Sequence, residues 1–342
     1  MQQEKRIAIL GGGSFGSAIA DLIAAKGLTV HLWMRNKQRV DEVNLKHTNE
    51  HYLPGFRLHQ SIKAFASLAE AVEQVDLVFV AVPSQSFREV SKQLALLIAP
   101  SVMVVSLTKG IEAANFLLMS QVLTEVLPNN PRGVMSGPNL AKEIVDKQIT
   151  ATVIATEKTE VREYVQSILH SHYFRVYSSQ DIYGVELAGA LKNCYAIICG
   201  MAAAIGCGQN TIGFLITRSL AEMSRFADHL GADPMTFLGL SGVGDLVVTC
   251  MSPLSRNYQV GFEVGLGKNL EETTKKLGQI AEGVNTLRLV KAMADKLNIY
   301  MPLVQGMYQI LFEKADLNTV VSDLMAGDQA LDVEFIASKV GN

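Results

Sequence analysis

A glycine-rich segment near the N-terminus has the residue types of an anion-binding turn. Gly11 and Gly13 follow a short apolar run and precede a helical pattern that starts at Ser14 and contains Gly16. In a strand–turn–helix of this kind, the glycines permit a tight turn, the approach of the backbone to a pyrophosphate, and close packing of helix on strand. The first N–H groups of the helix then face the anion. The segment predicts a dinucleotide-binding site; a structural turn without a cofactor is the alternative.

The end of the second predicted strand bears on which dinucleotide binds. A site specific for NAD has an acid there, which binds the ribose 2′-hydroxyl. Here the stretch from Val30 to Lys37 contains no acid and two cations, Arg35 and Lys37. The planar guanidinium of Arg35 can pair with a 2′-phosphate or stack on adenine. The stretch favours NADP, and a solvated loop charge is the alternative for Arg35.

Polar and glycine residues follow two later predicted strands. Lys109 comes just after one of them, and Gly137 and Asn139 come just after the next. Doubly wound sheets hold ligands at the carboxyl ends of their strands. We therefore expect Lys109 at the cofactor crevice and Gly137 and Asn139 along the same edge, although each segment alone is equally compatible with an ordinary turn.

A cation and an amide, Lys192 and Asn193, interrupt the most apolar stretch of the chain. Burying an amine without a partner is costly and lowers its pKa, which suits it to proton exchange near neutral pH. We therefore predict a catalytic role for Lys192. The alternative is a structural ion pair with Glu186 or with another acid.

Two later segments supply further charged groups. Asp245 offers a carboxylate at the end of a glycine-rich turn, and Ser255, Arg256 and Asn257 are three consecutive anion-binding residues. Arg256 suits a phosphate because a guanidinium donates two parallel hydrogen bonds and stays charged. The triplet predicts a phosphate-binding site.

Residues suited to other chemistries are scattered. The seven histidines include one close pair, His170 and His172, without a third ligand nearby, so we expect no metal. There is no Walker loop. The four cysteines form no Cys-x-x-Cys pair and are interpreted as small core residues, which fits a reducing, cytoplasmic compartment.

The elements that must position these residues change in kind along the chain. Short β-branched runs alternate with helical patterns in the first half, which is typical of a parallel sheet covered by helices. Predicted strands span residues 6–10, 29–33, 76–82, 102–107, 133–135 and 150–156. Predicted helices in the second half span residues 182–205, 212–230, 286–297 and 306–312. We expect an α/β, Rossmann-like doubly wound domain over residues 1–180 and an all-α substrate-binding and catalytic domain over residues 181–342.

Length and composition narrow the remaining classes. The 342 residues exceed the length of about 250–300 at which one core stops growing, which favours two domains. Thirty basic and 33 acidic residues give a net charge of −3, so nucleic-acid binding is disfavoured. The apolar run before Gly11 is too short for a signal peptide. Residues 193–217 carry no formal charge, but glycine and polar residues interrupt them, so two buried helices joined by a loop are expected rather than a membrane span.

Taken together, these segments resemble the bacterial NAD(P)-dependent glycerol-3-phosphate dehydrogenases. The resemblance runs through nearly the whole chain, in residues 11–16, 49–55 (NEHYLPG), 81–84, 106–112 (SLTKGIE), 136–143 (SGPNLAKE), 186–193, 240–245, 255–257 and 281–284 (AEGV). It implies reversible hydride transfer between a nicotinamide cofactor, NADP or NAD, and C2 of glycerol 3-phosphate or dihydroxyacetone phosphate, which supplies phospholipid synthesis. It also implies a homodimer.

The resemblance also implies roles for individual residues. Lys192 would transfer the proton, Lys109 would be shared between cofactor and substrate, and Asp245 would orient the site. The implied substrate-binding residues are Lys109, Gly137, Asn139, Lys192, Asn193, Asp245, Ser255, Arg256 and Asn257. The implied cofactor contacts, beside the three glycines, are Ser14, Phe15, Arg35, Tyr52, Lys109, Ala141, Arg256, Ile280 and Glu282. Two positions depart from the family pattern, because Asn139 stands where a hydroxyl residue is common and Phe15 replaces a Trp or Tyr.

Two other classes fit parts of the pattern. Another β-hydroxyacid or ketopantoate-type dehydrogenase would share the glycine loop and a helical second domain, but it would not need the triplet from Ser255 to Asn257. A non-catalytic dinucleotide-sensing module would keep the first 180 residues, but it would have no reason to bury Lys192 beside Asn193. A panel of substrates separates these classes.

Overall fold

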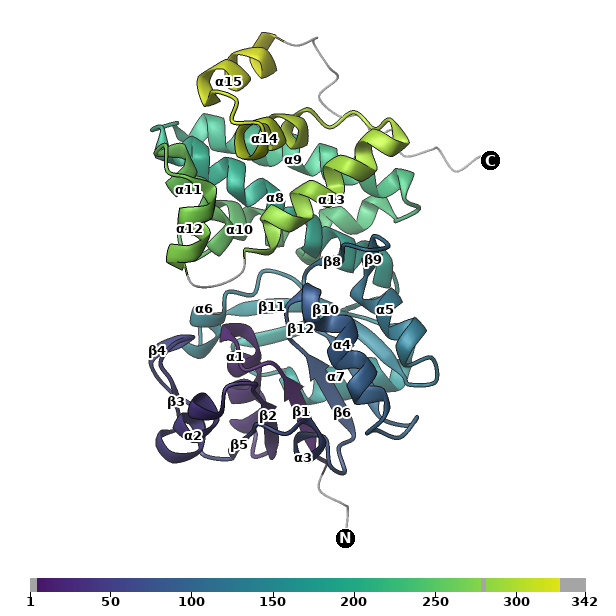
Figure 1. The fold of residues 1–342 in the computed structure, drawn as a ribbon. Coiled ribbons are helices and arrows are strands. Elements are labelled where there is room, and N and C mark those ends of the chain that lie inside the picture. Colours follow the sequence, from purple (N-terminus) through teal and green to yellow (C-terminus); the bar gives the residue numbers. More distant parts are fainter. Residues whose placement is uncertain (1–4, 278–280, 327–342) are drawn as a thin grey trace, which may run out of the picture. The chain divides into compact units, whose positions relative to one another are not determined.

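The computed structural model describes residues 5–277 and 281–326 (Figure 1). Contacts divide the chain into two compact units. Unit 1 comprises Met1–Ala190 and Leu238–Asp245, and unit 2 comprises Leu191–Phe237 and Leu246–Asn342. The first division falls inside one long helix, α8 (Ile182–Ala204), so the backbone crosses from one unit to the other without a loop.

Unit 1 is built on an eight-stranded sheet with the order β12-β11-β10-β7-β6-β1-β2-β5. Its strands are β1 (Ile7–Leu10), β2 (Val30–Trp33), β5 (Ile62–Phe65), β6 (Leu77–Val80), β7 (Met103–Ser106), β10 (Arg132–Ser136), β11 (Thr150–Ala155) and β12 (Phe174–Ser179). The sheet is parallel, as predicted, except at one pairing, where β11 runs antiparallel to β10. β12 is parallel to β11 and continues this reversed edge.

Helices cover both faces of this sheet. They are α1 (Ser14–Ala24), α2 (Lys37–Lys46), α3 (Leu68–Ala71), α4 (Ser84–Ala95), α5 (Met119–Val126), α6 (Ala141–Val145) and α7 (Thr159–Leu169). Apolar side chains of α1, α6 and α7 form one core cluster, and those of α3, α4 and α5 form another on the opposite face. The central strands are buried along their whole length, which explains why the sequence shows them as continuous apolar runs.

The topology of the sheet creates a ligand-binding edge. β1 lies between β2 and β6, and the chain leaves β1 toward β2 but later returns on its other side as β6. At such a switch point, the loops after the two strands turn away from each other and leave a crevice at their carboxyl ends. The glycine-rich segment follows β1 and therefore lies at this switch point.

Two hairpins in unit 1 were not predicted from the sequence. One consists of β3 (Thr48–Asn49) and β4 (Leu53–Arg57), and the other of β8 (Ile111–Glu112) and β9 (Leu117–Leu118). Both lie beside segments that carry candidate site residues.

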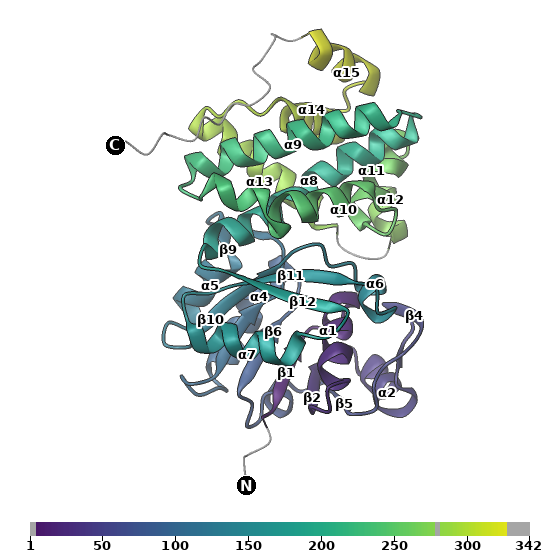
Figure 2. The same ribbon diagram turned by 180° about the vertical axis from the view of Figure 1, so that it is seen from behind.

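Unit 2 is helical, as predicted, and among the described residues no strand follows Ser179 (Figure 2). Beside α8, its helices are α9 (Gln209–His229), α10 (Asp245–Met251, whose first residue belongs to unit 1), α11 (Arg256–Gly265), α12 (Leu270–Leu277), α13 (Glu282–Leu297), α14 (Pro302–Phe312) and α15 (Leu317–Ala326). A short 3₁₀ helix spans Pro234–Leu238.

Helix α8 is apolar almost all round and is buried along most of its length. By length and composition it is the one described helix that could cross a membrane, but 89% of its most apolar window is buried within the protein. Packing therefore accounts for its apolar character. The expected second buried helix, α9, is instead amphipathic, since Phe214 and other residues on one side are exposed.

A buried carboxyl group ties three helices of unit 2 together. Glu222 of α9 accepts hydrogen bonds from the N–H of Leu303 at 2.6 Å and of Val304 at 3.3 Å, at the N-terminus of α14. It also accepts one from the Tyr195 hydroxyl of α8 at 3.1 Å. Burial raises the pKa of Glu222 to about 7, although these hydrogen bonds oppose the shift.

This group makes the stability of the protein depend on pH. A carboxyl group whose pKa rises from 4.5 to about 7 on folding contributes stability that is present below 4.5 and lost as the pH rises through about 7. Glu222→Gln carries no such group. The free energy of unfolding of the wild type minus that of E222Q should therefore fall between about pH 5 and 8, by about 1.4 kcal/mol per pH unit at most. Urea unfolding of both proteins measures it, and a difference that stays constant over this range would contradict the prediction.

Candidate active site

The glycine loop after β1 has the geometry of an anion-binding turn. Gly11 has a φ of +119°, and a Cβ there would come within 2.6 Å of the Ala81 carbonyl oxygen. A Cβ on Gly16 would come within 2.0 Å of the Gly11 carbonyl oxygen, whereas one on Gly13 would meet nothing within 4 Å. Gly13 therefore borders open space in front of α1, which has no side-chain cap at its N-terminus. The residues present fit a pyrophosphate held by the first turn of this helix.

The β3–β4 hairpin is fastened to this loop. The Ser14 hydroxyl donates to the Tyr52 carbonyl oxygen at 2.9 Å. The Asn49 side chain donates to the Gly12 carbonyl oxygen at 3.0 Å and to the Ser17 hydroxyl at 2.9 Å. Asn49 was not predicted as a site residue, although it opens the NEHYLPG segment. The hairpin thus holds the conformation of the loop.

The other predicted cofactor contacts of unit 1 lie on elements around this loop. Arg35 is exposed two residues after β2. Phe15 and Ala141 are the second residue of α1 and the first of α6, and both pack against the same apolar cluster. In unit 2, Glu282 is the first residue of α13. Ile280 lies outside the described residues.

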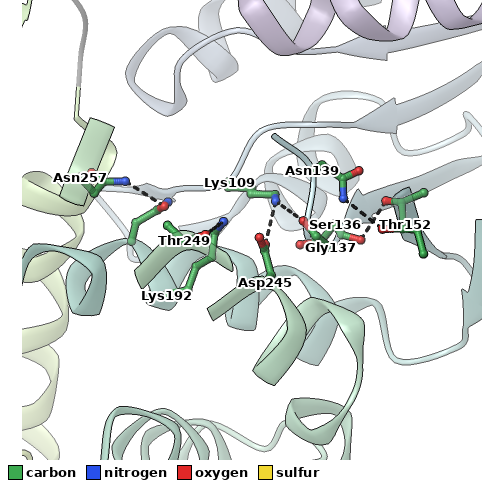
Figure 3. Close-up of polar contacts among 11 residues, drawn as sticks. Lys109, Ser136, Gly137, Asn139, Thr152, Lys192, Asp245, Thr249 and Asn257 are labelled. Atoms are coloured by element: carbon green, nitrogen blue, oxygen red, sulfur yellow. Dashed lines mark hydrogen bonds and ion pairs between the residues drawn. The ribbon is translucent and has the colours of Figure 1, made fainter. Parts of the chain in front are cut away.

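A partly buried lysine and a buried carboxylate of unit 1 form an ion pair (Figure 3). The Lys109 amine lies 2.7 Å from Oδ2 of Asp245, whose side chain is 1% exposed. The same amine donates to the Gly137 carbonyl oxygen at 2.8 Å. Lys109, Gly137 and Asp245 were predicted from three separate segments, and Asp245 lies 136 positions after Lys109. In the structure, Gly137 and Asp245 both contact the Lys109 amine.

The sheet explains this meeting. Lys109 follows β7 and Gly137 follows β10, and these neighbouring parallel strands end at the same edge. The hairpin that follows Lys109 is held by Arg88 of α4, whose guanidinium makes two hydrogen bonds to Glu112, at 2.6 and 2.9 Å. This pairing lowers the pKa of Glu112. The loop carrying Lys109 is thus fixed at both ends.

Two buried polar atoms beside the ion pair have no protein partner. They are the Ser136 hydroxyl and Oδ1 of Asn139. The Asn139 side chain makes one long hydrogen bond, at 3.5 Å, from Nδ2 to the Ala151 carbonyl oxygen. Buried polar atoms are nearly always hydrogen-bonded, so this edge has unused capacity to bind polar groups.

The predicted proton-transfer residue lies on α8 and is buried. The Lys192 amine donates to the Thr249 hydroxyl of α10 at 2.6 Å, within unit 2. Thr249 was not predicted, and nothing in its sequence surroundings signals the contact. The acid considered as a partner of Lys192, Glu186, accepts hydrogen bonds from the N–H and hydroxyl of Ser120. Burial raises the pKa of Glu186 to about 7.

An amide network in unit 2 follows directly after Lys192. Asn257 donates from Nδ2 to Oδ1 of Asn193 at 2.9 Å, and its own Oδ1 accepts from the Gly283 N–H at 3.0 Å. A Cβ on Gly283 would come within 2.3 Å of the Asn193 carbonyl oxygen, so only glycine allows α13 this close to α8. Gly283 belongs to the AEGV segment, which was the available signal for this contact.

The predicted phosphate-binding triplet forms the start of α11. Ser255 is its N-cap, and its hydroxyl accepts from the Tyr258 N–H at 3.3 Å. Arg256 is exposed at the first helical position, while Asn257 is buried by the amide network. A helix N-terminus with an arginine and a hydroxyl is a suitable environment for a phosphate.

A glycine loop on a doubly wound sheet, followed by a helical part with a buried lysine, is the arrangement of a class of NAD(P)-dependent dehydrogenases. The family model for the N-terminus of NAD-dependent glycerol-3-phosphate dehydrogenase matches residues 6–162, and the model for its C-terminus matches residues 181–322. The chain belongs to the NAD-dependent glycerol-3-phosphate dehydrogenase family.

Individual relatives agree with this assignment. The chain is 53% identical over 335 residues to glycerol-3-phosphate dehydrogenase [NAD(P)+] of Saccharophagus degradans, covering 98% of this chain and 94% of that one. It is 52% identical over 338 residues to the protein of the same name from Pseudomonas fluorescens, covering 99% of each. The crystal structure of glycerol-3-phosphate dehydrogenase from Coxiella burnetii has a TM-score of 0.91 at 36% identity, covering 95% of this chain and 99% of that one.

The rival class shares only the fold. A ketopantoate reductase from Ralstonia eutropha has a TM-score of 0.58 at 16% identity, covering 94% of this chain and 99% of that one. The alternative of a ketopantoate-type enzyme is therefore not favoured.

Proposed function

We propose that this protein catalyses the reversible NAD(P)-dependent interconversion of sn-glycerol 3-phosphate and dihydroxyacetone phosphate, with Lys192 as the proton donor and acceptor. The observation that carries the proposal is the buried Lys192 amine held by the Thr249 hydroxyl. A cation fixed in this way can both protonate an alkoxide and stabilise its developing charge.

The chain's own residues divide the work of the reaction. When bound, the nicotinamide cofactor supplies or accepts the hydride. The loop of Gly11, Gly13, Ser14 and Gly16 would hold its pyrophosphate. Asp245 would hold the positively charged amine of Lys109 in place, and this amine would contact both cofactor and substrate. In ketone reduction, Lys192 gives a proton to the C2 oxygen as that carbon receives the hydride. The neutral amine is then reprotonated from solvent.

The substrate's phosphate would be bound by the start of α11. Arg256 would supply a bidentate charged contact, and the Ser255 hydroxyl, which accepts from Tyr258, still has its own proton to donate. The side chain of Asn257 is hydrogen-bonded to Asn193 and Gly283. We therefore propose that Asn257 contacts the phosphate through its backbone N–H, at the N-terminus of α11. Binding energy from the phosphate would orient C2 for the reaction. Gly137, Asn139 and Asn193 would line the rest of the substrate.

We assign dinucleotide binding to residues 1–180 and substrate binding with catalysis to residues 181–342. We further propose that the enzyme is a cytoplasmic homodimer and that its physiological direction is reduction, which supplies phospholipid synthesis. The resemblance to bacterial glycerol-3-phosphate dehydrogenases supports these assignments, and the four cysteines without a disulfide among the described residues agree with a reducing compartment.

A substrate panel tests the proposed function. The purified protein is incubated with NADP+ or NAD+ and, in separate reactions, sn-glycerol 3-phosphate, pantoate, a β-hydroxyacid and glycerol. We expect reduced cofactor and dihydroxyacetone phosphate from the first substrate alone. Turnover of pantoate or the β-hydroxyacid in preference to glycerol 3-phosphate would contradict the proposal, and cofactor binding without turnover of any substrate would favour a sensing module.

Arg35 gives a prediction about cofactor choice. Arg35→Asp replaces a cation at the end of β2 by an anion, which should repel a 2′-phosphate. We expect the Kd of NADPH to rise much more than the Kd of NADH, as measured by nucleotide fluorescence. Equal losses for both nucleotides would assign Arg35 to adenine stacking, and no loss would leave it without a direct role.

A further inference from the structure

A second arginine lies near the end of β2. Arg39 is in the first turn of α2, where its N–H donates to Oδ1 of the N-cap residue Asn36 at 3.1 Å. Its guanidinium carbon lies 4.8 Å from the centre of the Tyr52 ring, which is within the range of a cation–π contact. The ring therefore holds a half-buried guanidinium whose backbone follows Arg35 by four residues.

Tyr52 connects this guanidinium to the glycine loop. The carbonyl oxygen of Tyr52 accepts from the Ser14 hydroxyl at 2.9 Å, and Asn49 of the same hairpin donates to the Gly12 carbonyl oxygen. Tyr52 is thus fixed to the first residue of α1. Arg39 therefore contacts Tyr52, which is hydrogen-bonded to the predicted pyrophosphate site. Arg39 itself belongs to α2, the helix that follows the predicted ribose site.

Two acids of α2 and the adjoining hairpin, Glu42 and Glu50, have other partners. Glu42, three positions later on α2, accepts hydrogen bonds from the Thr48 hydroxyl at 2.9 Å and from the Glu50 N–H at 2.8 Å. Glu50 accepts from the Gly55 N–H at 2.9 Å. Across residues 5–277 and 281–326, the Arg39 guanidinium has no hydrogen bond or ion pair, so its donors remain for a ligand.

We infer that Arg39 is a specificity-determining residue that binds the 2′-phosphate of NADP together with Arg35, and that the Tyr52 ring positions its guanidinium. The inference rests on the proposed function, because it takes dinucleotide binding at this edge as given. A planar guanidinium suits a phosphate because it donates bidentately and retains its charge. NAD has a hydroxyl at this position, so the contribution of Arg39 falls on NADP alone.

Binding of two half-cofactors tests the inference without any catalytic step. Adenosine 2′,5′-bisphosphate carries the 2′-phosphate and AMP lacks it, and calorimetry gives the Kd of each for the full chain. Arg39→Gln should raise the Kd of the bisphosphate by about 10- to 100-fold and that of AMP by less than about 3-fold, since one charged phosphate contact is lost. Arg57→Gln is the matched control, because Arg57 is an exposed arginine at the far end of the same hairpin. It should leave both values unchanged.

The role of the ring has its own comparison. Tyr52→Leu should reduce the preference for the bisphosphate over AMP, and Tyr52→Phe, which keeps the ring, should restore it. A preference in R39Q equal to that of the wild type would overturn the inference. A preference in Y52L equal to that of the wild type would overturn the positioning role of Tyr52. Failure of the wild type to bind the bisphosphate, AMP, NADPH and NADH would instead overturn the proposed function itself.

Discussion

Lys192→Met should lower the turnover rate by about 100-fold or more while the protein still folds and binds NADPH. Methionine keeps the length and apolar fit of the side chain in a buried position, but it removes the proton and the positive charge. The hydroxyl of Thr249 loses the amine that it accepts from, which costs far less than an unpaired charge would. The loss should therefore appear in the chemical step.

Single-turnover hydride transfer and NADPH fluorescence separate these effects. Thr249→Val is the companion variant, because it leaves the Lys192 amine in place and removes only its hydroxyl partner. We expect T249V to keep more activity than K192M. Near-normal hydride transfer in K192M would remove Lys192 from the mechanism and assign proton transfer to Lys109.

Arg256→Ala should lower kcat/KM for dihydroxyacetone phosphate by about 30-fold to several thousand-fold, which corresponds to a loss of about 2 to 5 kcal/mol of transition-state stabilisation. The variant removes the charged anchor of the phosphate at the start of α11. Arg256→Lys should have a kcat/KM between those of the wild type and Arg256→Ala, because lysine keeps the charge but cannot donate two parallel hydrogen bonds. The effect should be largest on the phosphorylated ketone and small on dihydroxyacetone.

Steady-state kinetics with both ketones measure this difference. Lys268→Ala is the control, because Lys268 is an exposed cation three residues beyond the end of α11 that pairs with Glu263. It should leave both constants unchanged. Equal losses for the two ketones in R256A would show that Arg256 does not bind the phosphate.

Elements with buried, continuous apolar runs were predictable from the sequence. The sequence predicted all of β1, β2, β6, β7, β10 and β11, because the apolar residues of each strand are recognisable from the local sequence alone. β5 and β12 were missed. Both are edge strands of the sheet, and Lys63 and Arg175 interrupt their apolar pattern at exposed positions.

The candidate site was predictable where it follows strand ends and glycine segments. Lys109 and Gly137 were placed at one edge by the logic of the sheet, and the structure joins them through one amine. Contacts that depend on tertiary packing could not be predicted from the sequence. Thr249 meets Lys192 across 57 positions, and Asn49 meets the glycine loop across 37, with no periodic pattern to connect either pair.

The most direct test of the proposed function compares two ketones that differ only by a phosphate. Oxidation of NADPH and NADH is followed with dihydroxyacetone phosphate and, in parallel, with dihydroxyacetone. The account predicts rapid oxidation of at least one nucleotide with the phosphorylated ketone and a kcat/KM at least about 100-fold higher than with the unphosphorylated one. Equal constants for the two ketones, or no oxidation with either, would contradict it.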